Sequence, residues 1–315
     1  MRVLVTGCAG FIGSNLCERL VHDGHDILGI DNFDPMYDVK IKKDNLKGLL
    51  PSDSFSFRKA DIRNFNAMKK IMGWKPERVV HLAAKAGIRP SINDPSGYLK
   101  ANVLGTVNVL ESMKSTGAPL VFASSSSVYG NANAPFSESD GSIFPLSPYA
   151  ASKRGAEIYC STYNQMYGMP ITCLRLFTVY GPRQRPDLAI HKFSKKISLG
   201  EKIQIFGKDT SRDYTYISDT VQGIVSALEK PMDFEIINLG RSNPVNIMDL
   251  VDLIEKGLGK KANLELIDTQ MGEVATTYAN IGKARKLLGY TPKVPIATGM
   301  GLFLDWFKEK NRLGK

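Results

Sequence analysis

The sequence is poor in the features that mark secreted, metal-binding and membrane proteins. Its 315 residues include only four cysteines (Cys8, Cys17, Cys160 and Cys173), too few for a disulfide framework and without the paired spacing of a zinc site. No apolar run approaches the length that spans a bilayer, and no basic leader precedes the first strand pattern, "RVLVT". We therefore expect a globular cytoplasmic protein with reduced, mostly buried thiols, no metal and no membrane association.

The composition has one excess, which is positive charge. A formal net charge of +10 could serve nucleic acid, an anionic small molecule or solubility alone. The basic residues are dispersed, and the densest clusters, "KIKKD" and "HKFSKK", lack the interleaved aromatic residues of a groove that binds nucleic acid. A nucleic-acid partner is therefore the weakest interpretation, and we expect none.

Short β-branched runs alternate with amphipathic helical stretches through the first half of the chain. Helical patterns at about 11–23, 64–72, 97–115 and 149–167 separate these predicted strands: "RVLVT", "DILGID", "SFSFRKAD", "RVVHLAA", "PLVFASS" and "PITCLRLF". This order predicts an α/β fold with a doubly wound parallel Rossmann-type sheet, whose ligands bind at the carboxyl ends of the strands.

Beyond Phe177 the alternation loosens into shorter strands such as "KIQIF" and "FEIINLG". We expect residues 1–178 to form the sheet domain, with a returning segment at about 213–240, and residues 179–315 to form a smaller, interleaved C-terminal lobe. The turn-rich segment 131–148 is predicted to be a surface loop near the ligand-binding edge of the sheet.

A glycine-rich turn follows the first predicted strand. In "TGCAGFIG", Gly7, Gly10 and Gly13 stand between that strand and a helix, where they allow a pyrophosphate to rest on the helix N-terminus. Asp31 ends the second strand, 18 residues after Gly13. A carboxylate there binds the adenosine ribose hydroxyls and repels a 2′-phosphate, which favours NAD over NADP.

A second pattern, "SPYAASKRGAE", sets Tyr149 and Lys153 one helical turn apart on the same face. A free tyrosine has a pKa of about 10, too high for a base at neutral pH, and a nearby ammonium stabilises its phenolate. Such a pair can take or give the proton of a hydroxyl group.

These motifs together resemble the extended short-chain dehydrogenase/reductase superfamily of nucleotide-sugar enzymes over nearly the whole chain. The segments "HLAAKAGIRPSI", "LRLFTVYGPRQRPD" and "SRDYTYISD" most resemble the UDP-glucuronate 4-epimerases. The resemblance implies a UDP-sugar substrate, NAD as cofactor and a nucleotide-sugar-binding role for the C-terminal lobe. It also implies a homodimer, paired through the helices at 97–115 and 149–167.

Three residues carry the chemistry that the resemblance implies. Tyr149 would be the acid/base on the sugar 4-hydroxyl, Lys153 would lower its pKa and hold the nicotinamide ribose, and Ser125 would hydrogen-bond the same oxygen. The implied cofactor-binding residues are Gly7, Gly10, Phe11, Ile12, Gly13, Asp31, Asn32, Asp61, Ile62, Leu82, Ala83, Ala84, Tyr149 and Lys153.

The serine row "SSSS" separates this chain from related dehydratases and decarboxylases, which carry Asp or Glu just after the catalytic Ser or Thr. Ser126 and Ser127 stand there instead. Hydroxyls cannot supply a strong acid or base but can donate hydrogen bonds to a substituent at C5. This favours oxidation and re-reduction without elimination. We expect neighbouring backbone to satisfy Ser124, and for Ser127 both interpretations stay open.

A carboxylate at C5 would need a cation, and Arg185 is the first candidate, with Thr178 beside it. Arg89 is a second candidate, and Arg183 could be confused with Arg185. Arg212 matches the arginine that contacts the UDP diphosphate, whereas Glu273 departs from the Gly-Asp of the family. The implied substrate-binding residues are Arg89, Ser125, Ser126, Ser127, Tyr149, Thr178, Arg185, Arg212 and Glu273.

The resemblance thus implies that a UDP-sugar, most closely UDP-glucuronate, is oxidised at C4 to a 4-keto sugar, turned over and reduced on its other face to UDP-galacturonate. A UDP-glucose/galactose 4-epimerase is the nearest alternative, followed by a UDP-glucuronate decarboxylase. A non-catalytic NAD(H)-binding sensor on the same fold is an alternative of a different class.

Overall fold

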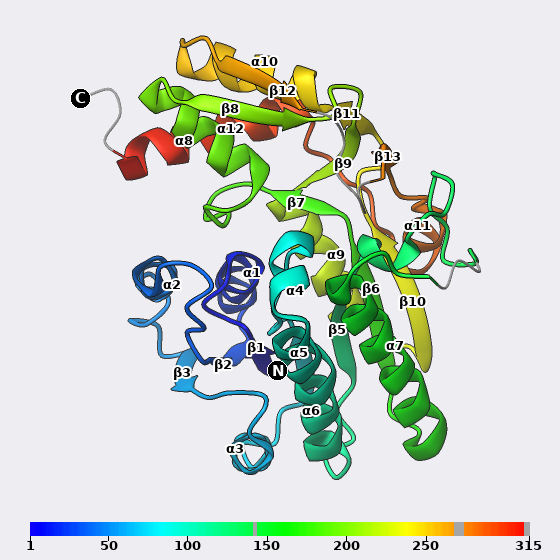
Figure 1. Ribbon diagram of the computed structural model, residues 1–315. Helices are drawn as coiled ribbons and strands as arrows, with labels where there is room; N and C mark the ends of the chain where they lie inside the picture. Colours follow the sequence, from blue (N-terminus) through cyan, green and yellow to red (C-terminus); the bar gives the residue numbers. More distant parts are fainter. Residues whose placement is uncertain (141–143, 268–273, 312–315) are drawn as a thin grey trace.

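A seven-stranded parallel sheet forms the larger lobe of the computed structural model, which describes residues 1–140, 144–267 and 274–311 (Figure 1). The strand order is β10-β6-β5-β4-β1-β2-β3. Its strands are β1 (Arg2–Thr6), β2 (Asp26–Asp31), β3 (Phe55–Lys59), β4 (Arg78–His81), β5 (Leu120–Ser125), β6 (Ile171–Leu176) and β10 (Phe234–Leu239). The order reverses beside β1, so the doubly wound sheet predicted from the sequence is confirmed and a ligand-binding crevice is expected at that point.

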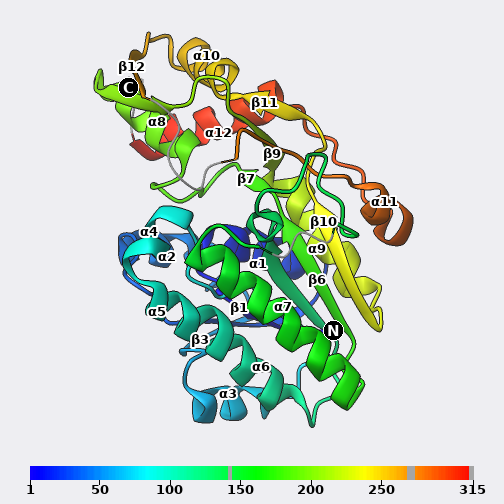
Figure 2. The ribbon, with the colours of Figure 1, turned by 45° about the vertical axis from the view of Figure 1, so that its right-hand side comes forward.

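Helices cover both faces of this sheet (Figures 1 and 2). Because side chains alternate along a strand, Val3 and Val5 of β1 belong to one core cluster and Leu4 to the other. The first cluster includes side chains of α1 (Phe11–His22) and α9 (Ile217–Glu229). The second includes side chains of α3 (Phe65–Met72), α6 (Gly105–Met113) and α7 (Pro148–Tyr167). The near-continuous burial of β5 and β6 follows from this double cover.

The helix expected at 97–115 consists of three consecutive pieces. The chain runs through α5 (Pro95–Tyr98), a π-helical stretch η1 (Leu99–Leu104) and then α6. Asn102, in the widened stretch, accepts a hydrogen bond from Lys85 N (2.8 Å) and donates to Lys85 O (2.9 Å), and it also donates to Ser152 Oγ (2.9 Å). The π-helical turn thus ties the segment after β4 to helix α7, an interaction that the apolar spacing of this region does not indicate.

The smaller lobe is built from short strands and helices that lie above the carboxyl ends of the large sheet in Figure 1. Strand β9 pairs with β7, β11 and β13, and β8 pairs with β12. The strands are β7 (Thr178–Tyr180), β8 (Lys202–Phe206), β9 (Ser211–Tyr216), β11 (Pro244–Asn246), β12 (Asn263–Ile267) and β13 (Thr276–Thr277). The helices that follow β7 and β10 are α8 (Ala189–Leu199), α10 (Ile247–Leu258), α11 (Gly282–Leu288) and α12 (Ile296–Asn311).

The chain passes between the lobes more than once. After β9 it forms α9 and then β10, which pairs in parallel with β6 of the large sheet. The domain limits 1–178 and 179–315, with the returning segment at about 213–240, remain a prediction.

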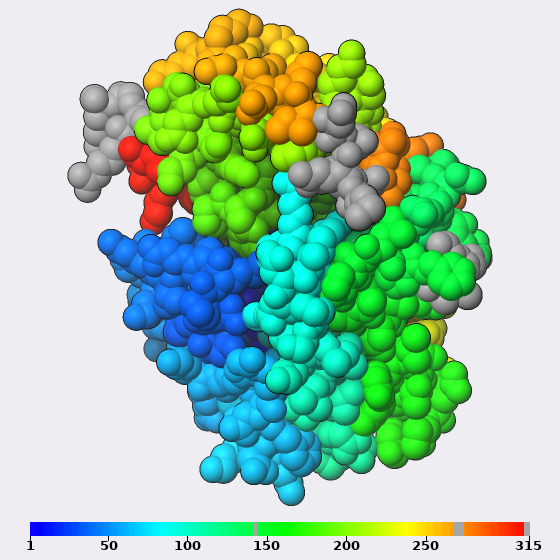
Figure 3. All heavy atoms as spheres, in the orientation of Figure 1, coloured from blue at the N-terminus to red at the C-terminus, as the bar shows by residue number. Residues whose placement is uncertain are grey.

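The lobes also meet at α4 (Ile88–Asn93), shown in cyan against the green atoms of the smaller lobe in Figure 3. There the guanidinium of Arg89 lies 4.4 Å from the ring centroid of Phe206 in β8. Of the helices in the described part of the chain, none is long and apolar enough to cross a membrane.

Candidate active site

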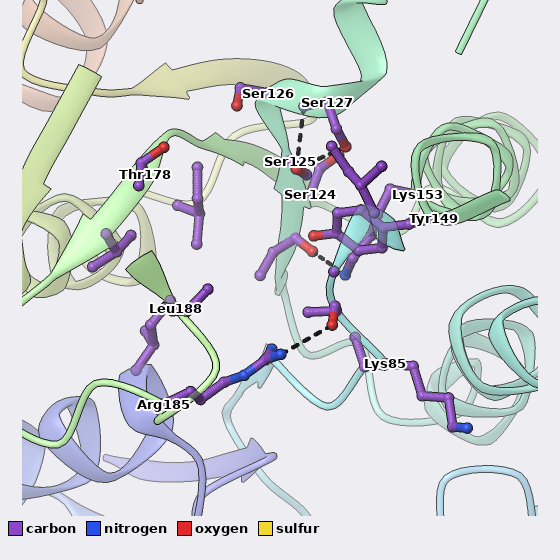
Figure 4. Close-up of a pocket in the computed structure, with 18 of the residues that line it drawn as sticks. Lys85, Ser124, Ser125, Ser126, Ser127, Tyr149, Lys153, Thr178, Arg185 and Leu188 are labelled. Carbon is purple, nitrogen blue, oxygen red and sulfur yellow. Dashed lines mark hydrogen bonds between the residues drawn. The ribbon is translucent and has the colours of Figure 1, made fainter. Parts of the chain in front are cut away.

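A cavity of about 560 Å³ lies where the two lobes meet at the carboxyl ends of the central strands. The glycine-rich turn, the segments after β4 and β5, the first turn of α7 and the chain after β6 all contribute to its wall. Figure 4 shows Tyr149 and the serine row on one side of this cavity, Thr178 opposite, and Arg185 reaching in from below. The cavity therefore brings together residues that are up to 270 positions apart in the sequence, from Gly7 to Thr277.

The glycine-rich turn is as compact as its sequence predicts. Gly7 has φ +74°, and a Cβ there would lie 2.8 Å from Ala83 N. A Cβ on Gly13 would lie 2.1 Å from Gly7 O. Helix α1 begins directly after Gly10 with no side-chain cap, which leaves the positive end of the helix dipole to an anion. Gly7, Gly10, Phe11, Ile12 and Gly13 all line the cavity, as do Leu82, Ala83 and Ala84.

Four other predicted cofactor-binding residues do not line the cavity. Asp31 accepts hydrogen bonds from Phe33 N (2.8 Å) and Ala9 N (3.3 Å), and burial raises the pKa of its carboxyl group. Asn32 donates to Asp61 (3.0 Å). Asp61 also pairs with Arg63 (2.6 Å), whose hydrogen bonds lower its pKa to about 2. Ile62 is buried in the core. None of Asp31, Asn32, Asp61 and Ile62 is a wall residue.

Lys42, which the sequence patterns did not single out, lines the cavity from α2 (Val39–Leu46). Its side chain is 7% exposed, and its Nζ lies 4.9 Å from the ring centroid of Tyr37. Its charge partly offsets the effect of burial, which raises the pKa of Asp31. The helical spacing could have indicated this residue. Lys42 lies on the same face of the helix as the buried Asn45 and Leu46, whereas Lys40 and Lys43 do not lie on that face. A buried cation beside Asp31 is suited to a polar or anionic ligand.

Helix α7 presents the predicted acid/base residue. Ser147 caps the helix by accepting from Ala150 N (3.2 Å), and Pro148 starts the first turn, so Tyr149 stands at the cavity. Its hydroxyl hydrogen-bonds Ser125. Burial raises the pKa of Tyr149, and the Ser125 hydrogen bond and the Arg185 charge act to lower it. In this arrangement Arg185 is a cation that favours the phenolate.

Lys153 lies one turn further along α7 and is also buried. Its Nζ donates to Ala123 O (2.7 Å) and lies 4.9 Å from the ring centroid of Phe122. Burial lowers its pKa to about 8. Lys153 lines the same cavity as Tyr149, and its ammonium is still largely protonated at pH 7.

The four serines of the row lie at the cavity wall, and Ser124 is also anchored by a buried partner. The expectation that backbone satisfies Ser124 is wrong, because Ser124 Oγ donates to the carboxylate of Glu157 in α7 (2.6 Å). The next residues turn into a short 3₁₀ helix, η2 (Ser126–Tyr129), and Ser127 Oγ donates to Ser125 Oγ (2.9 Å). Ser124, Ser125, Ser126 and Ser127 all line the cavity, and Figure 4 shows Ser126 pointing away from Tyr149.

The structure separates the two neighbouring arginines of "PRQRPD". Arg183 pairs with Glu18 of α1 outside the cavity wall. Arg185 lines the cavity, where it donates to Ala86 O (3.1 Å) and pairs with Asp187 (2.6 Å). The alternative candidate, Arg89, stacks on Phe206 and is not a wall residue. Of the three, Arg185 is therefore the cation that faces the cavity beside Thr178.

Arg212 of β9 also lines the cavity, and its Nη1 donates to Ser211 O (2.9 Å) and Ala275 O (3.1 Å). Backbone carbonyls fix this side chain without neutralising its charge, which suits it to an anionic group. Glu273 lies outside the described residues. Among the residues that the structure describes, no group of His, Cys, Asp and Glu could hold a metal ion.

Comparison with known proteins gives concordant results. The sequence model of the NAD dependent epimerase/dehydratase family matches residues 3–240. A UDP-glucuronate 4-epimerase of Thermodesulfobacterium geofontis is 44% identical over 99% of this chain and 98% of its own length. The crystal structure of UDP-glucuronic acid 4-epimerase from Bacillus cereus, in complex with UDP-glucuronic acid and NAD, is 37% identical with a TM-score of 0.94, over 98% of this chain and 100% of that one.

A UDP-glucose 4-epimerase from Thermotoga maritima, solved with UDP-glucose, has the same architecture. It is 30% identical with a TM-score of 0.90 and covers 99% of this chain and 100% of its own. The fold alone therefore does not distinguish a substrate with a carboxylate at C5 from one with a hydroxymethyl group.

Proposed function

Because the chain belongs to the NAD-dependent epimerase/dehydratase family, we propose that it converts UDP-glucuronate to UDP-galacturonate by epimerisation at C4. One observation carries this function. The guanidinium of Arg185 faces the same cavity as Tyr149, Lys153 and Ser125, and the serine row beside them holds no carboxylate. A base, a proton-sharing hydroxyl and a cation for the substrate carboxylate thus surround one ring-sized space.

The glycine-rich turn and Lys42 fit NAD. We assign the pyrophosphate to the N-terminus of α1, which has no side-chain cap. Close packing leaves no room for a side chain at Gly7 and Gly13, which supports this assignment. Asp31 and Lys42 lie side by side at the place where a ribose would be held. When bound, the cofactor supplies hydride chemistry, accepting hydride from C4 and returning it to the opposite face of the ring.

Tyr149 moves the proton in both half-reactions. Its phenolate takes the proton of the 4-hydroxyl during oxidation, and its hydroxyl returns a proton to that oxygen during reduction. Ser125, already hydrogen-bonded to Tyr149, shares the same oxygen. Lys153 is largely protonated near neutral pH, and we assign its ammonium to the nicotinamide ribose and to support of the phenolate.

The carboxylate site protects the intermediate. Oxidation at C4 of a glucuronyl ring gives a β-keto acid, which loses CO₂ when the breaking C–C bond overlaps the carbonyl π system. We assign Ser126, Ser127, Thr178 and Arg185 to holding the carboxylate out of that alignment. Arg185 provides the charge, and the hydroxyls provide directed hydrogen bonds. We assign Arg212, which lines the cavity from the smaller lobe, to the UDP diphosphate.

We further propose that the protein is a homodimer. Leu99 and Leu104 of η1 and Ile158 and Met166 of α7 expose between 48% and 63% of their surface. Such large apolar side chains on neighbouring helices support a helix-to-helix interface between two copies. Light scattering on the purified protein should give twice the chain mass, and Ile158→Glu should give the monomer mass. A wild-type monomer would contradict the proposal.

We also propose a cytoplasmic location. All four cysteines are free and buried, and the side chains of Cys160 and Cys173 contact each other by a hydrogen bond. An adjacent pair that remains reduced fits a reducing compartment. Cell fractionation should recover the protein with the cytosolic fraction, and its appearance in an oxidising compartment would refute this location.

The decisive experiment is incubation with UDP-glucuronate, with and without added NAD, followed by proton NMR. UDP-galacturonate as the main product supports the proposed function. A UDP-pentose or 4-keto-pentose would make the protein a decarboxylase. Conversion of UDP-glucose alone would make it the related UDP-glucose 4-epimerase, and no conversion of either sugar would leave the NAD-binding sensor.

A further inference from the structure

Arg185 does not enter the cavity as a free side chain, because Asp187 grips it. Asp187 Oδ1 accepts from Nε of Arg185 (3.0 Å), and Oδ2 accepts from Nη2 (2.6 Å). The two residues are separated only by Pro186, whose ring fixes its own φ and restricts the residue before it. This short, stiff link holds the pair together at little entropic cost.

The remaining donors of Arg185 determine what it can offer to a ligand. Nη2 also donates to Ala86 O (3.1 Å), so the Nε edge and Nη2 are both engaged. Within the described residues, none accepts a hydrogen bond from Nη1. The side chain is 14% exposed and that of Asp187 is 42% exposed, so Asp187 holds the guanidinium from the solvent side and leaves Nη1 for the cavity.

We propose that Asp187 is a positioning residue that fixes Arg185 for the recognition of a carboxylate-bearing sugar. The proposal rests on the proposed function, since it gives Arg185 the substrate carboxylate as its partner. Without Asp187, the long side chain keeps only Ala86 O as an oxygen acceptor and must be ordered each time substrate binds. A substrate without a carboxylate does not bind this guanidinium, so its affinity should not depend on Asp187.

Charge acts in the opposite direction. Asp187 is negative and would repel a nearby substrate carboxylate, but its exposed side chain is screened by water. Positioning should therefore outweigh repulsion. Ordering one long side chain is worth about a three- to tenfold change in affinity, which sets the size of the expected effect.

The test compares Asp187→Ala, Asp187→Asn and Asp187→Glu in the NAD-loaded protein, with KM and kcat measured for UDP-glucuronate and the Kd measured for UDP-glucose. Asp187→Ala should raise KM for UDP-glucuronate about three- to tenfold with little change in kcat, and should leave the Kd for UDP-glucose unchanged. Asn, which keeps one acceptor, should fall between wild type and Ala, and Glu should restore part of the loss.

The neighbouring pair provides a matched control. Glu18→Gln breaks the ion pair of Arg183, which is two residues from Arg185 but outside the cavity wall. It should change neither the KM for UDP-glucuronate nor the Kd for UDP-glucose. Tighter UDP-glucuronate binding by Asp187→Ala would show that repulsion dominates and would overturn the proposal, as would equal losses for both sugars. A wild-type protein that leaves UDP-glucuronate unconverted would refute the proposed function instead.

Discussion

The buried carboxylate of Glu157 allows a sharp prediction about stability. Its side chain is 0% exposed and accepts hydrogen bonds from Ser124 Oγ (2.6 Å), Arg154 (2.8 Å) and two nitrogens of Arg175 (both 2.9 Å). These donors hold the pKa of Glu157 below its ordinary value. The side chain of Arg175 is itself only 5% exposed. Removing the negative charge of Glu157 therefore leaves the buried guanidinium of Arg175 without its carboxylate partner.

Glu157→Gln should lower the free energy of unfolding by about 3–5 kcal/mol, the usual cost of breaking one side of a buried ion pair. Replacing both partners, as in Glu157→Gln with Arg175→Met, should recover part of this loss, because the stranded charge is gone. The matched control is Glu265→Gln, which breaks an exposed pair with Lys202 (3.7 Å) and should cost less than about 1 kcal/mol.

The assay is urea unfolding at a fixed NAD concentration, followed by circular dichroism, since bound ligand adds its own stabilisation. A Glu157→Gln protein within about 1 kcal/mol of wild type would refute the reasoning, because the pair would then contribute no more than a surface pair. A double variant less stable than Glu157→Gln would also refute it, since the cost would then not come from an unpaired Arg175.

Four further outcomes test the site. Tyr149→Phe should lower kcat by about 10²–10⁴ while UDP-glucuronate still binds, as loss of a positioned acid/base requires; an unimpaired variant would contradict the mechanism. Because burial lowers the pKa of Lys153 to about 8, its ammonium is lost as the pH rises through that value, so NAD affinity measured by calorimetry should fall above pH 8 in the wild type and stay level in Lys153→Met. Gly13→Ala should abolish NAD binding because its Cβ would lie 2.1 Å from Gly7 O, whereas Gly301→Ala, which has open space, should bind NAD normally. Arg185→Gln should weaken UDP-glucuronate far more than UDP-glucose, and equal losses on both would remove it from the carboxylate site.

The features predictable from the sequence are those whose cause is local. The glycine turn, Asp31 at a strand end and the Tyr149–Lys153 spacing each follow from a few adjacent residues, and the parallel sheet follows from alternating strands and helices. The preference for UDP-glucuronate over UDP-glucose, in contrast, depends on side chains that separate elements bring to the cavity. The sequence makes Arg185 the first candidate but does not exclude Arg183, two residues before it. Arg183 adopts φ +69° and pairs with Glu18, an interaction that depends on the packing of α1.

The partners of the serine row also depend on contacts between separate elements, which the structure shows. Side chains alternate along β5, so Ser124 lies on the same face as Phe122, the face that packs against α7. Ser124 therefore meets Glu157 of α7, whereas Ser125 ends the strand and interacts with Tyr149 in the first turn of that helix. The 3₁₀ turn then folds Ser127 back onto Ser125. Identical side chains in one short run thus have different surroundings: Ser124 bonds to a carboxylate of α7, and Ser125 and Ser127 bond to each other.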